Sequence, residues 1–441
     1  MKPLLTNRLG GEDAAWLHME DPNNPMIVNG IVELAGQLPR ERVVELARHH
    51  LDPRMRARVV ERRLGVGGPR WEADPGFDIE SHIESVSLPA STEDAALREF
   101  IGRTVSTLLD RDKPLWRLYL IERPGAGTTL LFRVHHAIGD GFALLGMLLS
   151  MCDEPPSLPV MANAVKPSGH RAADQARSLA LLALLPPDPK SLLKAELGTD
   201  KRVAWSEPLS LDEIKAIAKA SSATVNDVLV STIAGALRRY LLHHGASIDD
   251  RFALRAMLPV NLRSEPATTM GNHFGLVVLT LPVGEADARD RLMTVKRRMD
   301  HLKSTPEAVV AYELLWAMGY APRKVEGLGV DFFGKKSSLV LTNVPGPRER
   351  LHLAGVAIER MIFWVPQSAH MGLGVSIFSY AGEVTFGVIS DANIIADPDT
   401  LVAEMHVELA ALKARSRARA AAVASAAAAA EAPREETAAP R

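Results

Sequence analysis

The chain has 441 residues, 51 Lys and Arg against 53 Asp and Glu, and a single cysteine, Cys152. A length near three times a typical domain of ~150 residues predicts two domains with an ample buried core. One cysteine excludes an intramolecular disulfide, and no Cys/His spacing predicts a metal site. Because the formal charge is −2 and no basic stripe is present, nucleic acid is not an expected partner. These features are typical of a soluble globular protein in a reducing compartment.

No export signal and no membrane span are predicted. The first residues contain no apolar run of the length that a secretory signal needs. The longest apolar stretches, residues 142–152 and 179–187, are shorter than the roughly 20 residues that cross a bilayer. We therefore expect a cytoplasmic location, with any membrane contact peripheral.

Residues 1–152 alternate strand-like and helix-like patterns without a regular βαβ repeat or a glycine-rich phosphate loop, which predicts an α/β domain of the α+β kind. The expected elements, in chain order, are a strand at 27–34, helices at 40–49 and 95–108, and strands at 116–122 and 128–134. Between the last two strands, RPGAG predicts a tight hairpin connection, because Pro and Gly favour turns.

Residues 153–207 are rich in Pro, Ser, Ala and charged residues, with the successive helix breakers EPPSLP, KPSGH and LLPPDPKS. This composition predicts a crossover linker. Within it, residues 176–185 (ARSLALLALL) are apolar on nearly every face. Such a segment indicates a buried helix first, and a partner groove or a membrane-surface contact as alternatives.

A second α/β domain is expected over residues 208–419. Its first helix begins after Ser210, with Glu213 completing a capping box. The next helix is long and carries apolar residues at steps of four, namely Val225, Leu229, Ile233, Leu237 and Leu241. The other expected elements are strands at 254–258, 276–281, 338–342, 371–380 and 384–390, a helix at 286–303 and a helix beyond Pro398. Residues 420–441 are low-complexity, and we expect them to be disordered.

The strongest chemical signal is the segment VHHAIGDG, residues 134–141, at the end of the last N-terminal strand. A neutral imidazole, with a pKa near ~6.5, can take a proton from a hydroxyl that attacks a carbonyl. His136 is therefore the predicted general base. Since adjacent side chains at a strand end point to opposite sides, His135 is expected to pack or hydrogen-bond behind it.

The acid and the glycines of this motif have predicted supporting roles. Asp140 is expected to hold the loop by pairing with an arginine or with backbone amides. Gly139 and Gly141 are expected to permit backbone angles or close approaches denied to larger residues. A plain polar loop and a metal site are the alternatives. The metal signal is weak, because a metal needs a third ligand placed by the fold and the sequence identifies none.

Further short motifs accompany H-H-x-x-x-D-G in a fixed order: EDPNNPM at 20–26, DKPLW at 112–116, ND at 226–227, PVNLR at 259–263, GN at 271–272 and NVPGP at 343–347. The histidine motif resembles the active-site signature of the CoA-dependent acyltransferase superfamily, which includes chloramphenicol acetyltransferase and the condensation domains of peptide synthetases. The ordered set covers roughly residues 8–412 and resembles the bacterial wax ester synthase/acyl-CoA:diacylglycerol acyltransferase family.

The resemblance implies two similar chloramphenicol-acetyltransferase-like domains, with a tunnel at their interface and the histidine motif midway along it. Acyl-CoA would enter as co-substrate, with no bound cofactor, and diacylglycerol or a fatty alcohol would be the acceptor. His136 would deprotonate the acceptor hydroxyl for direct attack on the thioester, so no acyl-enzyme is expected. The sequence is consistent, because it has no G-x-S-x-G elbow and Cys152 lies in an apolar stretch. Peripheral contact with the inner membrane or lipid droplets is also expected.

The candidate residues fall into three groups. The catalytic motif comprises His135, His136, Asp140 and Gly141. The substrate-binding candidates are Leu115, Trp116, Asn272 and Asn343, and the structural candidates are Pro114, Asn226, Asp227, Arg263, Pro345 and Gly346.

Most of these residues also have an ordinary structural explanation. A Pro followed by Leu115 and Trp116 at a strand start is typical of a core, although both could line an acyl tunnel. Asn272 is a candidate donor to the oxyanion, or a turn residue. Asn and Asp at 226–227 are typical helix caps, and 343–347 is typical of a rigid turn, here expected near the CoA arm.

Two positions depart from the family pattern and leave the acceptor open. Asn261 stands in PVNLR where the family often has Ser, and His273 follows GN. The acceptor could be a fatty alcohol, diacylglycerol, or another alcohol such as a polyketide or a sugar. A non-catalytic protein that binds lipid or acyl-CoA is the alternative from another class, and the intact His136, Asp140 and Gly141 speak against it.

Overall fold

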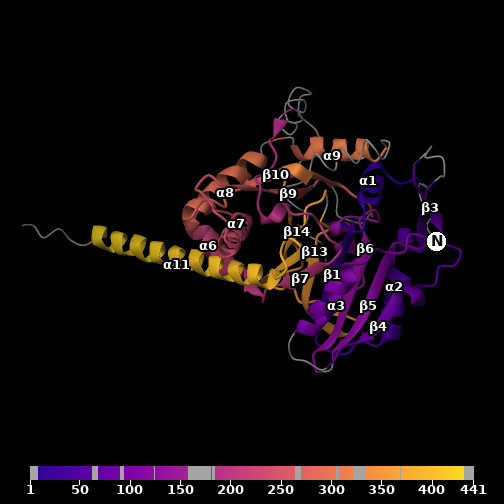
Figure 1. Ribbon diagram of the computed structural model, residues 1–441. Helices are drawn as coiled ribbons and strands as arrows, with labels where there is room; N and C mark the ends of the chain where they lie inside the picture. The colour runs from indigo at the N-terminus through magenta and orange to yellow at the C-terminus, as the bar shows by residue number, and fades with distance from the viewer. Residues whose placement is uncertain are drawn as a thin grey trace, which may run out of the picture.

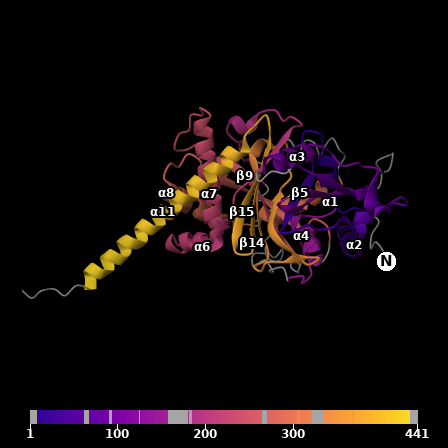
Figure 2. The same ribbon diagram turned by 90° about the horizontal axis from the view of Figure 1, so that it is seen from below.

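The computed structural model describes residues 8–61, 68–89, 94–123, 125–156, 180, 184–263, 270–303, 305, 307–320, 334–367 and 369–431. These residues form two main β-sheets flanked by helices, and a long C-terminal helix that runs out from the body (Figures 1 and 2). None of the helices in the described ranges is both long enough and apolar enough to cross a membrane.

The first sheet has the strand order β12-β13-β1-β6-β5-β4. Its strands are β1 (Ile27–Leu34), β4 (Ile83–Ser87), β5 (Trp116–Arg123), β6 (Gly127–His135), β12 (His352–Leu353) and β13 (Val356–Trp364). Strands β5 and β6 form the predicted antiparallel hairpin, and β1 pairs antiparallel with β6 so that Ile27 lies opposite His135. The residues just before β1 consequently lie beside the histidine motif.

We call the first sheet and the elements of residues 8–152 the first half of the molecule, and the second sheet with its helices the second half. Helices and a small hairpin complete the first half. They are α1 (Gly11–Met19), α2 (Arg40–His50), α3 (Ala95–Val105) and α4 (Gly141–Ser150), the 3-10 helices at Pro53–Arg56 and Ile79–His82, and the strands β2 (Ala57–Val60) and β3 (Arg70–Ala73). The expected strand at 27–34 and helices at 40–49 and 95–108 are confirmed to within a few residues. Helix α1 was not expected, because its residues show almost no amphipathic pattern and most of them are buried.

The second sheet has the order β10-β9-β11-β14-β15-β7, with β8 paired to β15. Its strands are β7 (Lys201–Trp205), β8 (Leu209–Ser210), β9 (Leu254–Asn261), β10 (Phe274–Leu281), β11 (Leu339–Pro345), β14 (Leu373–Tyr380) and β15 (Glu383–Asp391). Its helices are α6 (Leu211–Ala220), α7 (Val225–His243), α8 (Ala288–Lys303), α9 (Glu307–Met318) and α11 (Pro398–Glu431), with a 3-10 turn at Leu192–Lys194. The expected second sheet-bearing domain is therefore present.

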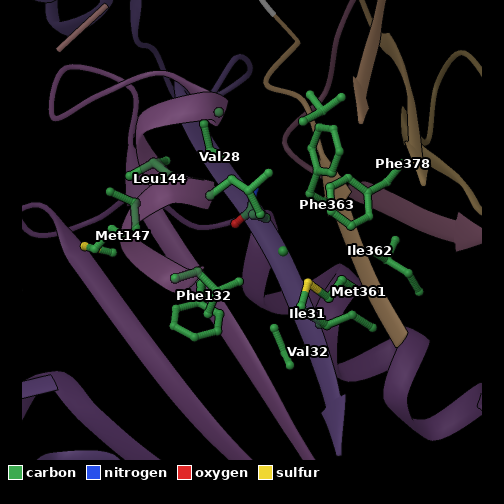
Figure 3. Close-up of a pocket in the computed structure, with 17 residues that line it drawn as sticks. Val28, Ile31, Val32, Phe132, Leu144, Met147, Met361, Ile362, Phe363 and Phe378 are labelled. Atoms are coloured by element: carbon green, nitrogen blue, oxygen red, sulfur yellow. The ribbon is translucent and has the colours of Figure 1, made fainter. Parts of the chain in front are cut away.

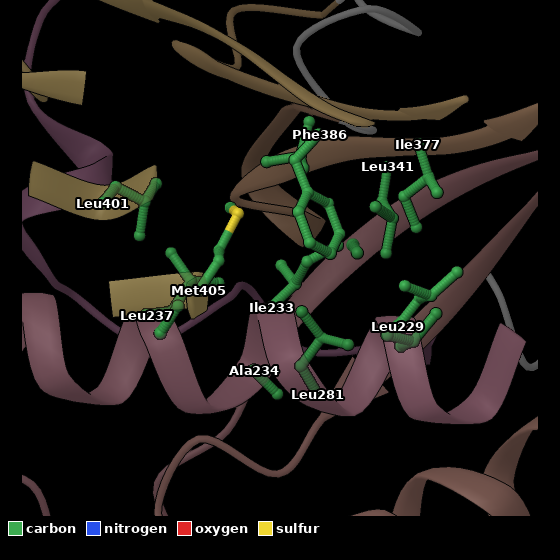
Figure 4. Packing of buried hydrophobic residues seen from close by; sticks show 14 of the residues in the cluster. Leu229, Ile233, Ala234, Leu237, Leu281, Leu341, Ile377, Phe386, Leu401 and Met405 are labelled. Carbon is green, nitrogen blue, oxygen red and sulfur yellow. The ribbon is translucent and has the colours of Figure 1, made fainter. Parts of the chain in front are cut away.

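Helix α7 is the centre of the core of the second half. Leu229, Ile233, Leu237 and Leu241 of its predicted apolar face are buried, whereas Val225 is partly buried, and Figure 4 shows this face packed below Phe386 of the sheet and Met405 of α11. Each buried Leu or Ile of this kind stabilises the fold by about 1.5–3 kcal/mol. The sequence pattern alone was sufficient to place this helix, since its apolar period matches its burial.

Capping differs from the expectation at the two neighbouring helices. Ser210 Oγ accepts a bond from the Glu213 N–H (3.3 Å), as predicted, but the Glu213 carboxylate pairs with Lys413 and does not return to the cap. The reciprocal capping box lies at the next helix, where Thr224 Oγ1 accepts from the Asp227 N–H (3.2 Å) and Asp227 Oδ2 accepts from the Thr224 N–H (2.8 Å). Asp227 is thus a structural residue, as predicted.

The predicted domain boundaries need three corrections. Strand β7 lies inside the expected linker 153–207 and pairs with β15, and β13 leaves the expected second domain 208–419 to pair with β1. Without β13, β1 would expose an unpaired edge, which sheets avoid. Residues 420–431, expected to be disordered, continue α11, since alanine has the highest helix propensity. The apolar segment 176–185 lies outside the described residues except Ala180, Leu184 and Leu185.

Candidate active site

The histidine motif occupies the loop between β6 and α4, and backbone hydrogen bonds hold both histidines. The His135 N–H donates to the Leu115 carbonyl (2.9 Å), and the His136 N–H donates to the Met26 carbonyl, just before β1 (2.8 Å). The two side chains then enter different surroundings, as the alternation at a strand end predicts. His136 lines a large cavity, whereas His135 is fully enclosed.

His136 sits against aromatic rings. Its ring stacks on Trp16 of α1 with centroids 4.2 Å apart and planes 19° apart, and Phe274 of β10 lies 5.6 Å away. Burial lowers the pKa of His136 to about 4, although the charge of Asp140 and the bond to Asn272 act in the opposite direction. The imidazole is therefore neutral at pH 7, as a general base must be.

Asn272 determines which nitrogen of His136 carries the proton. Its Nδ2 donates to the His136 carbonyl (2.7 Å) and to Asp13 Oδ1 (2.8 Å), so its Oδ1 is the atom 2.7 Å from His136 Nδ1. An amide oxygen only accepts, hence Nδ1 carries the hydrogen and Nε2 keeps its lone pair. The prediction that Asn272 donates to the oxyanion is wrong, because both amide hydrogens are already engaged. Asn272 therefore positions the ring of His136.

Asp13, on α1, completes this network and was missed in the sequence. Its Oδ1 also accepts from the Asn272 backbone N–H (3.1 Å), and its Oδ2 pairs with Arg54 (3.0 Å). Burial raises the pKa of Asp13 to about 6, against the lowering effects of Arg54 and Asn272. The sequence contains no signal for this role, because an acid in the first turn of a helix is ordinary, and only the structure shows that Asp13 is buried.

His135 supports the loop from behind. Its Nδ1 accepts from the Ala137 N–H (3.0 Å), so its Nε2 carries the proton and lies 3.4 Å from Glu20 Oε1. Glu20 also pairs with Arg111 (2.9 Å). Burial alone would raise the pKa of Glu20, but His135 and Arg111 outweigh it and lower that pKa to about 2. His135 therefore has a structural role, as the sequence predicted.

Asp140 ties the motif to the second half. It caps α4 by accepting from the Phe142 and Ala143 N–H groups (3.1 and 3.0 Å), and it accepts from the His273 N–H (3.0 Å). Arg263 donates to both of its oxygens at 2.7 and 2.5 Å, and both side chains are buried. The expected arginine partner is thus Arg263, which also donates to the Gly271 carbonyl (2.7 Å).

The two motif glycines differ in their surroundings, and neither has a positive φ. A Cβ at Gly139 would lie 3.2 Å from Ala143 Cβ and from Met270 Sδ, where the loop meets Gly271. A Cβ at Gly141 would meet nothing within 4 Å, because it would project into the cavity. The expected close approach is confirmed for Gly139, whereas Gly141 keeps the substrate space open.

The cavity has a volume of about 1120 Å³ and is lined by both halves of the chain. Its walls are mainly apolar, and among the described residues four charged side chains line it: Asp140, Lys303, Arg348 and Glu349. A space of this size, mostly apolar with few polar groups, is typical of a site for a large apolar ligand.

Two predicted substrate contacts are wrong. Leu115 and Trp116 are 1% and 3% exposed, belong to the core of the first half, and do not line the cavity. The Trp116 indole donates to the Met55 carbonyl (2.7 Å), which fixes it in that core. Pro114 is buried beside them, as its structural assignment predicted.

The remaining candidates meet at the opposite wall. Asn343 lines the cavity, as predicted, and its Nδ2 donates to Asn226 Oδ1 (2.9 Å). Asn226 was expected to cap a helix, but Thr224 is the cap, and Asn226 lines the cavity. Pro345 and Gly346 line it as well, and a Cβ at Gly346 would lie 2.4 Å from the Ser379 carbonyl, so this turn requires glycine.

Within the described ranges, no three His, Cys, Asp or Glu side chains converge as a metal site would require. Asp140, the acid nearest the histidines in sequence, is occupied by Arg263 and backbone amides.

Comparisons with known proteins agree on a two-domain acyltransferase fold. A wax ester synthase/diacylglycerol acyltransferase from Marinobacter aquaeolei VT8 superposes with a TM-score of 0.69 at 24% identity, covering 93% of this chain and 99% of that one. The first condensation domain of the CDA synthetase matches with a TM-score of 0.63 at 15% identity, covering 94% and 97%. The chain therefore has the fold of these two-domain proteins, with the histidine motif at the interface of the two halves.

The family descriptions are more specific. Residues 9–188 match the wax ester synthase/diacylglycerol acyltransferase catalytic domain, and residues 270–413 match the WS/DGAT C-terminal domain. A Mycobacterium tuberculosis protein whose name places it among the diacylglycerol O-acyltransferases is 26% identical over 88% of this chain and 87% of its own length. The chain therefore belongs to the wax ester synthase/diacylglycerol acyltransferase family, and it is an acyltransferase enzyme.

Proposed function

We propose that the protein transfers a long-chain acyl group from acyl-CoA to a lipid hydroxyl, making triacylglycerol from diacylglycerol, wax ester from a fatty alcohol, or both. The observation that carries this proposal is the state of His136. Its Nδ1 is committed to Asn272 at 2.7 Å, which leaves Nε2 as a proton acceptor on a mostly apolar cavity.

The reaction proceeds by direct attack. His136 Nε2 takes the hydroxyl proton of the acceptor as its oxygen bonds to the thioester carbonyl carbon. The tetrahedral intermediate then expels the CoA thiolate, the C–S bond breaks, and the imidazolium returns its proton to the sulfur. A low pKa favours this return, since the protonated ring is an unstable state in the buried site.

A covalent acyl-enzyme on the cysteine is not part of this mechanism. Cys152 is buried in the core of the first half and does not line the cavity. Burial, reinforced by Asp153, raises the pKa of its thiol to about 12, so the reactive thiolate is not formed at pH 7.

The cavity matches both substrates in chemistry. Its apolar walls suit alkyl chains, and Lys303 and Arg348 supply cations for the phosphates of a CoA co-substrate. We assign no resident cofactor. The acceptor is a lipid alcohol, because the walls beside His136 are Trp16 and Phe274, which offer a sugar or a polyketide few hydrogen-bonding partners.

Peripheral binding to the inner membrane or to a lipid droplet belongs to the same proposal, with the protein on the cytoplasmic side. Trp316 and Tyr320, at the end of α9, are 48% and 43% exposed, and Arg8 lies over the Tyr320 ring (5.1 Å). Aromatic side chains with a nearby cation suit the headgroup region of an anionic lipid surface. Replacing both aromatics by Ser should reduce co-sedimentation with anionic vesicles and leave turnover of a dispersed substrate unchanged.

The test of the reaction is turnover of labelled palmitoyl-CoA by the purified protein, offered hexadecanol and dioleoylglycerol in parallel. His136→Ala serves as the blank. Ester formed by the wild type alone supports the proposal and ranks the two acceptors. Tight binding of acyl-CoA without ester from either acceptor would favour a lipid-binding protein instead.

A further inference from the structure

A second, smaller chamber opens beside the active-site cavity. Its volume is about 90 Å³, and it shares Val28, Gly141, Val344 and Phe363 with the main cavity. Because Gly141 follows the motif acid directly, the junction between the two spaces lies at the histidine motif. A substrate held at His136 can therefore extend into this chamber.

The chamber lies between the first sheet and α4. Figure 3 shows Leu144 and Met147 of α4 on one side and Phe363 and Phe378 on the other, with Phe132 at the far end. Phe363 and Phe378 pack edge to face, with centroids 5.7 Å apart, which makes that wall rigid. Every side chain that faces the chamber from these elements is apolar.

Asn29 borders the chamber but does not make it polar. Asn29 is only 3% exposed, and its side chain lies on the other face of the sheet. There its Oδ1 accepts from Arg133 Nε (3.2 Å) and its Nδ2 donates to the Ile27 carbonyl (3.0 Å). A water molecule would find no hydrogen-bonding partners in such a space, whereas an alkyl chain is stabilised by moving into it from water.

Gly30 creates the hollow. It lies on the middle strand β1, with Phe132 of β6 opposite it on one side and Phe363 of β13 on the other. These neighbours on the same face are large, and Gly30 has no side chain. Its φ is not positive, so the backbone does not require glycine at this position. The close approach of β13 restricts a side chain here, and its absence leaves the space between Phe132 and Phe363 open.

We propose that this chamber is an alkyl-chain pocket and that Gly30 sets the length of chain that the enzyme accepts. The inference rests on the proposed function and deepens it. The chain is the unbranched alkyl group of one of the two substrates, the acyl donor or the lipid alcohol. The residues that line this chamber take the place of Leu115 and Trp116, which the sequence analysis suggested as the lining of an acyl tunnel.

The variants follow from the contacts around Gly30. A Cβ at this position would lie 3.2 Å from the Ile362 carbonyl and 3.3 Å from Phe363 Cβ, so alanine fits after a small shift and valine fills more of the hollow. Gly36→Ala is the matched control, because its Cβ would meet only Val356 at 3.5 Å, outside the chamber.

Two substrate series identify the chain. In the first, kcat/KM is measured from hexanoyl-CoA to stearoyl-CoA with hexadecanol constant, and in the second from hexanol to octadecanol with palmitoyl-CoA constant. Each methylene that enters an apolar site is worth about fourfold. Gly30→Ala and Gly30→Val should lower kcat/KM for the longest chains by about tenfold or more in one series, and shift its optimum to shorter chains. Gly36→Ala should match the wild type.

The series that shifts tells which substrate occupies the pocket. Leu148→Ala, on the α4 wall, should move the same optimum toward longer chains, and it keeps the test open if the Gly30 variants do not fold. Unchanged optima in both series, for folded Gly30→Val and Leu148→Ala, would overturn the proposal.

A binding measurement separates this inference from the proposed reaction. S-alkyl-CoA thioethers and free alkanols of increasing length are titrated into the wild type and Gly30→Val by calorimetry. Chain-length-dependent binding that Gly30→Val cuts short supports the pocket even if no ester forms. If ester forms but neither binding nor turnover depends on Gly30, the result supports the proposed reaction and contradicts the alkyl-chain pocket.

Discussion

The two halves of the molecule contribute differently to the site. The first half carries the reactive loop, with His135, His136 and Asp140 within six residues. The second half supplies the groups that hold it, since Asn272 binds the ring of His136 and Arg263 binds Asp140. The motif is therefore an incomplete site by itself. The ring of His136 acquires one defined tautomer only when the two halves meet.

The largest effect is expected from replacing the two histidines one at a time. His136→Ala should lower kcat by about 10²–10⁴-fold, because it removes the general base. His135→Ala should instead lower the free energy of unfolding by about 1–3 kcal/mol, since it leaves the Ala137 N–H without its acceptor and removes one of the partners of the buried Glu20. Ester formation and urea unfolding measured on both variants test this contrast. Equal losses of activity in folded protein would contradict it.

The next effect concerns the ion pair that joins the halves. Asp140→Ala or Arg263→Ala should each destabilise the protein by about 3–5 kcal/mol, because each leaves a buried charge unpaired. Removing both should cost less than the sum of the two. The exposed pair Lys296–Asp300 is the control, and breaking it should change the free energy of unfolding little, because solvent screens exposed charges. A purely additive thermodynamic cycle at Asp140 and Arg263 would show that the halves are held elsewhere.

A smaller effect is expected at the positioning amide. Asn272→Leu should lower kcat by about 10–100-fold with little change in KM, because the ring of His136 loses its fixed tautomer and the Asp13 carboxylate loses the side-chain donor of Asn272. Asp13→Asn should cause a weaker loss of the same kind. If Asn272→Leu raises KM and leaves kcat intact, Asn272 contacts substrate and does not position the base.

The smallest effect is a pH dependence of stability. The ordinary pKa of histidine, 6.5, falls to about 4 at His136, so between these values the unfolded chain binds the proton and the native protein does not. Stability is therefore lost as the pH falls through this window, by at most about 3 kcal/mol. Asp13, whose pKa rises from 3.8 to about 6, acts in the opposite sense, because the native state keeps its proton.

The two opposing groups make a variant comparison informative. Relative to the wild type, His136→Ala should gain stability as the pH is lowered from 7 to 4, and Asp13→Asn should lose it, in thermal unfolding at each pH. Parallel curves for wild type and His136→Ala would mean that the histidine is not buried neutral as described.

Periodic and short-range features were predictable from the sequence. The apolar steps of α7 and the Pro/Gly turn between β5 and β6 depend on residues close in the chain. Helix α1 was missed because it is buried on several faces and so carries no amphipathic pattern. Strand β13 was missed although its residues could form a strand, and its pairing with β1 depends on a contact over more than three hundred residues.

The sequence by itself determined which groups are reactive: a histidine pair at a strand end, an acid to hold the loop, and a set of motifs typical of one family. Only the tertiary structure decided which role each residue has. It turned Asn272 from an oxyanion donor into the partner of His136, moved Leu115 and Trp116 into the core, and brought Asp13 into the site. The physical reason is that reactivity depends on burial and hydrogen-bond geometry, and both arise from contacts between distant parts of the chain.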